Sequence, residues 1–112
     1  MIDLDSARKA LIAERQRLGA ELVEPIEAPG QMTYGSQAAA ASGVFDQQRA
    51  LALRDRSRAQ LELVDAAIRR LDSDTYGQCE GCGRPIDPER LDALPWAELC
   101  IDCQRAATRP RR

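Results

Sequence analysis

Apolar residues recur at three- and four-residue steps along two stretches of the chain, and each stretch predicts an amphipathic helix. In residues 3–24 the apolar positions are Leu4, Ala7, Leu11, Leu18 and Leu22. In residues 37–73 they are Leu61, Val64, Ile68 and Leu71, with Val44 and Leu51 expected to extend the same seam towards the start of the helix. Residues 25–36 contain two prolines and two glycines and predict a loop. The pattern therefore predicts an antiparallel hairpin, and packing between its helices is sufficient to explain the seam.

The four cysteines form two pairs in the order C-x2-C-x17-C-x2-C. These are Cys79, Cys82, Cys100 and Cys103. Two residues between paired thiolates let one tight turn aim both sulfurs at one point, and two such turns complete the tetrahedron of a structural zinc site. Gly77 is placed to turn the chain into the first pair, and Gly81 and Gly83 let the backbone fold closely round a metal. Because four thiolates leave no position for water, we predict one structural zinc ion.

Other uses of four cysteines stay open at the level of the sequence. Two disulfides suit a secreted chain, a C-x-x-C redox site usually accompanies a βαβ pattern, and an iron–sulfur centre takes four thiolates at different spacings. Residues 1–5 contain neither a basic region nor an apolar run, so they predict no signal peptide. No segment approaches the ~20 apolar residues of a membrane span. We therefore expect a cytoplasmic protein without membrane contact, in which zinc is favoured over disulfides.

Charge and composition exclude several function classes. The net charge is −2, and within residues 79–103 the arginines Arg84 and Arg90 face six acids, which argues against direct DNA binding. The exception is a basic tail that contains Arg105, Arg109, Arg111 and Arg112. The chain has no histidine. With no nucleophile beside a base and no open metal position, the sequence does not predict an enzyme.

The segment between the cysteine pairs predicts a short helix. Asp87 can cap that helix and Pro88 suits its first position. We expect Trp96 to pack over the zinc and shield it, and a terminal helix to run through residues 101–107. The predicted fold class is mainly α, an antiparallel hairpin coiled coil followed by a small C4 zinc finger with a short C-terminal helix. Its two units are the hairpin, residues 1–75, and the finger with its basic tail, residues 76–112.

Three stretches together resemble the DksA/TraR family. They are YGQCEGCG at residues 76–83, LCIDCQ at residues 99–104 and RDRSR at residues 54–58. The resemblance is strong over residues 54–104, weaker over the rest of the hairpin and absent from the loop. It implies a zinc-containing transcription regulator that binds bacterial RNA polymerase. In that family the hairpin enters the secondary channel, through which nucleotides reach the active site, and acidic tip residues alter promoter complexes, often with the alarmone ppGpp.

The family's tip motif, D-x-x-D-x-A, falls on Ser36, Ala39 and Ala41, so the final alanine is kept and both aspartates are absent. The basic residues that contact the alarmone in the family fall near Leu63, Leu94 and Gln104, none of which is basic. We therefore expect polymerase binding with a non-acidic tip and without dependence on ppGpp. Further candidate contacts on the shaft of the hairpin are Arg54, Arg56 and Arg58. A DNA-binding finger, a general protein-interaction module and a thiol redox switch remain as alternatives.

Overall fold

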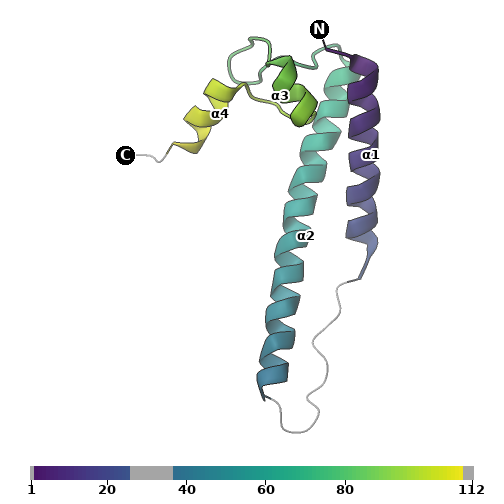
Figure 1. Ribbon diagram of the computed structural model, residues 1–112, viewed down its shortest axis with the longest axis vertical. Helices are drawn as coiled ribbons and strands as arrows, with labels where there is room; N and C mark the ends of the chain where they lie inside the picture. Colours follow the sequence, from purple (N-terminus) through teal and green to yellow (C-terminus); the bar gives the residue numbers. More distant parts are fainter. Residues whose placement is uncertain (1, 26–36, 110–112) are drawn as a thin grey trace.

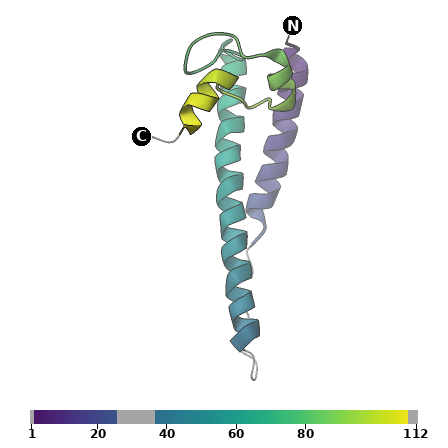
Figure 2. The ribbon, with the colours of Figure 1, turned by 60° about the vertical axis from the view of Figure 1, so that its left-hand side comes forward.

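The structure, a computed structural model, describes residues 2–25 and 37–109. In this part of the chain the helices are α1 (Leu4–Val23), α2 (Gln37–Asp72), α3 (Pro88–Ala93) and α4 (Ile101–Thr108). Helices α1 and α2 lie side by side as an antiparallel hairpin, and the segment that carries α3 and α4 folds against the end of α2 (Figures 1 and 2). The molecule is elongated, 62 × 40 × 20 Å. The predicted mainly helical class, a hairpin followed by a finger with four clustered cysteines, is confirmed.

Helix α1 begins at a side-chain cap. Asp3 is its N-cap, and Oδ1 of Asp3 accepts hydrogen bonds from the backbone N–H groups of Asp5 and Ser6 at 3.1 and 3.2 Å. These bonds satisfy donors that a first helical turn otherwise leaves without a partner. The helix buries Leu11 and Leu18, as its apolar pattern predicts, whereas Leu4 in its first turn is half exposed.

Helix α2 ends in a left-handed residue that the sequence does not signal. Asp74 has a φ of 60°, and the N–H of Thr75 donates to the carbonyl of Arg70 at 2.9 Å. This six-to-one bond is the defining contact of a Schellman motif, in which glycine or asparagine is more usual at the left-handed position. Gly77, with a φ of 88°, then turns the chain into the first cysteine pair as expected.

The hairpin core occupies only the end of α2 that lies beside the finger. Its buried residues are Leu11, Leu18, Val64, Ala67, Ile68 and Leu71. At 1.5 Å per residue the 20 residues of α1 span about 30 Å, and the 36 residues of α2 span about 54 Å. Much of the first half of α2 therefore extends beyond the end of α1 (Figure 1).

The predicted extension of the seam through Val44 and Leu51 is wrong. Both side chains are exposed, at 44% and 48%. Stepping back from Leu61 by four and three residues instead gives positions that are all partly buried, namely Ser57, Arg54, Ala50, Gln47 and Gly43. Val44 and Leu51 each follow one of these positions, so they are rotated about 100° from the seam. The seam does continue along α2, but small and polar residues occupy it.

The expected place of Trp96 also needs correction. Its ring packs against the hairpin core, not against the cluster that surrounds the cysteines. Tyr76 contacts both clusters and donates from its hydroxyl to the carbonyl of Pro95 at 2.9 Å. Burial raises the pKa of Tyr76, which keeps the hydroxyl protonated as a donor. These contacts join the finger to the hairpin. The division of the chain into two units near residue 75 stays a prediction.

Within the described ranges, no helix is both long enough and apolar enough to cross a bilayer.

Candidate metal centre

The two cysteine pairs meet at one point beside the end of α2. The Sγ atoms of the four cysteines all lie within 4.8 Å of one another. The first pair occupies the turn that follows α2, whereas Cys100 is the N-cap of α4 and Cys103 lies in its first turn. Cys79 is buried and Cys82 is exposed, so the cluster sits at the surface of the finger with Cys79 on its covered side.

Backbone N–H groups point at these sulfur atoms. Sγ of Cys79 accepts hydrogen bonds from the N–H of Cys100 at 3.2 Å and from that of Gly81 at 3.3 Å. Sγ of Cys100 accepts from the N–H of Cys103 at 3.5 Å, as an N-cap side chain does. Such donors stabilise the thiolate form.

The thiols differ in pKa because of these contacts. The N–H of Cys100 is the main cause that lowers the pKa of Cys79 to about 6. The neighbouring sulfurs, Cys79 first, raise the pKa of Cys103 to about 12, because they accept its proton in a hydrogen bond. Four thiolates this close repel one another strongly unless a cation neutralises them. The arrangement is therefore suited to a divalent ion.

Two glycines shape the first turn in different ways. Gly83 has a φ of 76°, a conformation that side chains rarely adopt. Gly81 is needed for space, because a Cβ there would lie 3.0 Å from Sγ of Cys103. The turn is closed by two backbone bonds, from the N–H of Cys79 to the carbonyl of Arg84 at 2.8 Å and from the N–H of Gly83 to the carbonyl of Cys79 at 2.9 Å.

These residues fit one structural zinc ion. None of the four cysteines is paired in a disulfide in this structure. Four sulfur ligands that converge from two tight turns form a closed tetrahedral zinc site, and zinc in such a site stabilises the fold. The apolar core around it is small, with Cys79, Ile86, Leu91 and Ala97 as its buried residues. A finger with so little core depends on the metal.

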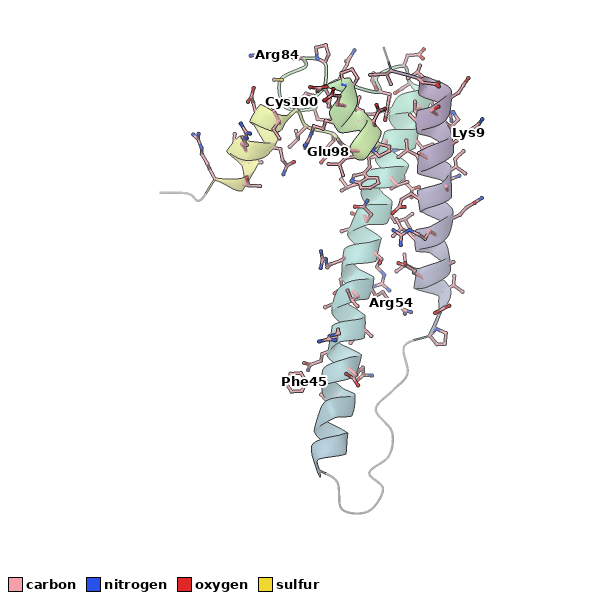
Figure 3. The ribbon with its side chains drawn as sticks, in the orientation of Figure 1. Lys9, Phe45, Arg54, Arg84, Glu98 and Cys100 are labelled. Atoms are coloured by element: carbon pink, nitrogen blue, oxygen red, sulfur yellow. The ribbon has the colours of Figure 1, made fainter. Side chains whose placement is uncertain are left out.

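The candidate polymerase contacts lie away from the cysteines. Ser36 lies outside the described residues, and Ala39 and Ala41 fall within the first turns of α2. Arg54 points towards the end of α1 (Figure 3), where its Nη2 donates to the carbonyl of Glu24, the C-cap of that helix. This contact gives Arg54 a place within the hairpin that the sequence did not predict.

The other two arginines of this stretch are more accessible. Arg58 lies 3.6 Å from Asp55 on the same helix, an exposed pair of the kind that contributes little to stability. Arg56 is exposed. Sequence reasoning missed Arg70, because a charged residue one step from an apolar seam is usually solvated, whereas this one is buried.

Comparisons with known proteins agree on one family. The family model for the prokaryotic dksA/traR C4-type zinc finger matches residues 74–109. The RNA polymerase-binding transcription factor DksA of Haemophilus influenzae is 44% identical over 54 residues, which are 48% of this chain and 37% of that protein. A protein of Aquifex aeolicus is 36% identical over 111 residues, covering 90% of this chain and 69% of its own length.

A solved structure extends the similarity to the hairpin. Transcription factor DksA2 from Pseudomonas aeruginosa superposes with a TM-score of 0.76 at 29% sequence identity, over 93% of this chain and 81% of that one. The sequence match to DksA of Haemophilus influenzae spans little more than a third of that protein.

Proposed function

This chain belongs to the DksA/TraR family of C4-type zinc-finger proteins, and we propose that it is a transcription regulator that binds bacterial RNA polymerase. One observation carries the proposal: the hairpin and the finger are arranged as in DksA2 along nearly the whole chain, 93% of it. A related protein that shares the finger sequence is named as RNA polymerase-binding. Zinc has a structural role in this proposal, because it would hold the two cysteine pairs of the finger together.

We place the contact with polymerase on the first half of α2, through the secondary channel. This half projects beyond α1 and carries the positions Ala39 and Ala41, and the turn of α2 that follows it presents Arg56 and Arg58 to solvent. Arg54 has a weaker claim, because its guanidinium is already bonded to the end of α1. No carboxylate occupies the motif positions Ser36 and Ala39. Such a tip excludes competing factors but adds no charge beside the catalytic metals.

A pull-down tests the binding. Tagged, zinc-loaded protein should retain purified RNA polymerase at micromolar concentration, and an excess of another secondary-channel factor should displace it. An Arg56→Ala, Arg58→Ala double variant should bind more weakly, while Arg105→Ala on α4 serves as a matched arginine control. Absence of specific association at micromolar concentration rejects the function. If the competitor does not reduce the amount of polymerase retained, binding through the secondary channel is rejected.

A gain-of-function variant tests the tip. Ser36→Asp combined with Ala39→Asp restores both carboxylates of the motif and should leave affinity for polymerase nearly unchanged. It should introduce promoter-dependent effects in run-off transcription, because a charge acts strongly where water is excluded. The native protein should show no ppGpp-dependent inhibition of a ribosomal promoter. If it does show such inhibition, the proposal for the tip is wrong.

A further inference from the structure

A buried arginine connects the last turns of α2 to the zinc finger. Arg70 is only 8% exposed, although arginine is rarely buried without partners. Its Nη2 donates a hydrogen bond to the carbonyl of Ala97 at 3.4 Å, and its Nε lies 4.0 Å from Oε1 of Glu80. Ala97 precedes the second cysteine pair and Glu80 lies within the first. One side chain of the hairpin therefore reaches both halves of the finger.

The contacts of Arg70 are long and incomplete. Its Nε is buried and has no hydrogen-bond partner among the described residues. Both distances lie at the long end for such interactions. A buried donor without a partner destabilises the fold, and buried ion pairs often contribute no more than apolar side chains of the same size. Stability alone therefore gives no reason for a guanidinium at this position.

Three successive residues of the segment that Arg70 contacts interact with the hairpin or with Tyr76, which packs on the hairpin core. We call residues 95–98 the strap. The carbonyl of Pro95 accepts from the Tyr76 hydroxyl, the ring of Trp96 packs on the hairpin core, and the carbonyl of Ala97 accepts from Arg70. The carbonyl of Glu98, labelled in Figure 3, accepts from the N–H of Glu80 at 2.8 Å. The strap therefore connects the hairpin to the first cysteine turn.

The contacts to the strap differ in how closely they define its position. Apolar packing of Trp96 is non-directional and tolerates small sliding movements. The hydrogen bond from Tyr76 to Pro95 is directional, but Tyr76 lies after the end of α2. The hydrogen bond from the planar guanidinium of Arg70 is also directional and comes from α2 itself, and the facing carboxylate of Glu80 favours the same placement of the charge. We propose that Arg70 is a positioning residue, which fixes the orientation of the zinc finger relative to the hairpin. Removing its charge loosens that orientation and leaves both parts folded.

Orientation can be measured directly on the zinc-loaded protein by residual dipolar couplings of backbone amides. In the wild-type protein, couplings from α1, α2 and the finger should fit a single alignment tensor. Arg70→Met keeps an unbranched side chain without the charge. Its couplings should fit only with separate alignment tensors for hairpin and finger, and the tensor of the finger should have the smaller magnitude. Arg70→Lys should restore the single tensor at least in part. Arg69→Met alters an exposed arginine on the same turn and should behave as wild type.

Two further measurements separate positioning from stability. Arg70→Met should keep one zinc per chain and a thermal midpoint within about 4 °C of wild type. Emission from Trp96, the single tryptophan, should shift to the red because the strap moves on the hairpin core. A single tensor for Arg70→Met, as in wild type, overturns the proposal. A much lower midpoint overturns it too, because Arg70 would then act through stability. The proposal is independent of polymerase binding, since every measurement uses the protein alone.

Discussion

The two halves of α2 belong to one continuous helix but differ in what their seam positions contain. Between residues 58 and 72 the seam carries large apolar side chains, and Val64 and Ile68 are buried against α1. Between residues 43 and 57 the same seam carries glycine, glutamine, alanine, arginine and serine, each partly buried. The larger apolar side chains of this half point elsewhere, and Phe45 is 74% exposed on the side of α2 away from α1 (Figure 3).

This difference indicates that the two halves have separate roles. The half beside the finger, which we call the base half, contains nearly all of the hairpin's buried apolar surface. The distal half, residues 43–57, has little internal packing to hold it. Helical propensity alone makes a short isolated segment marginal in water. We infer that the base half stabilises the protein and that the distal half is available for contact with a partner.

Removal of zinc should have the largest effect, and it should act on the finger beside the base half. Structural zinc contributes on the order of 10 kcal/mol in small fingers, so chelation should unfold residues 76–107. The hairpin should keep part of its helix, because its seam does not use the metal. Circular dichroism with a zinc-release assay measures both effects. Protein purified without chelator that contains no zinc would contradict the metal assignment.

Truncation of one apolar side chain in each half should distinguish the two halves next. Ile68→Ala in the base half should lower the free energy of unfolding by about 2–5 kcal/mol, because it leaves a cavity among buried neighbours. Leu51→Ala in the distal half should change it by less than about 0.5 kcal/mol, because that side chain is already exposed. Urea unfolding of both zinc-loaded variants makes the comparison. Equal losses at the two sites would remove the distinction between the halves.

At the boundary between the halves we expect a smaller effect. Arg54→Ala removes the donor to the carbonyl of Glu24 at the end of α1, which should cost about 1 kcal/mol. Arg56→Ala, an exposed arginine two residues further on, is the matched control and should be neutral. If both variants unfold at the same urea concentration, the bond from Arg54 is not formed in solution.

The smallest effect should come from the most exposed aromatic residue. Phe45→Ser should change the free energy of unfolding by less than about 0.5 kcal/mol, since the ring packs on little in the free protein. The measurement is again urea unfolding. A loss above 1 kcal/mol would show that this half of α2 has packing partners, and the two halves would then be more alike than we describe.

The features that could be predicted from sequence depend on local pattern. Apolar periodicity gave α1 and the base half of α2, and the cysteine spacing gave the metal centre. The pairing of Asp87 with Pro88 gave the start of α3, where Asp87 is the observed N-cap. Each helix signal lies within a few residues of the helix it specifies, and the two C-x2-C pairs identify the metal ligands although 17 residues separate the pairs.

The features that sequence reasoning missed depend on contacts between distant segments. Val44 and Leu51 are apolar, but only the observed register shows that they lie one position off the seam. Trp96 packs on the hairpin core and Arg70 reaches into the finger, and both contacts cross the joint between the two parts. Asp74 is a local exception, because it adopts a left-handed conformation in which aspartate is enriched but still uncommon.

The most direct test of the account is amide hydrogen exchange of the zinc-loaded protein, alone and with RNA polymerase. In the free protein, amides of residues 61–71 should exchange slowly and those of residues 43–57 faster, because local opening follows buried packing. Addition of polymerase should slow exchange in residues 43–57. Slow exchange of residues 43–57 in the free protein, or no change there when polymerase is added, would contradict the account.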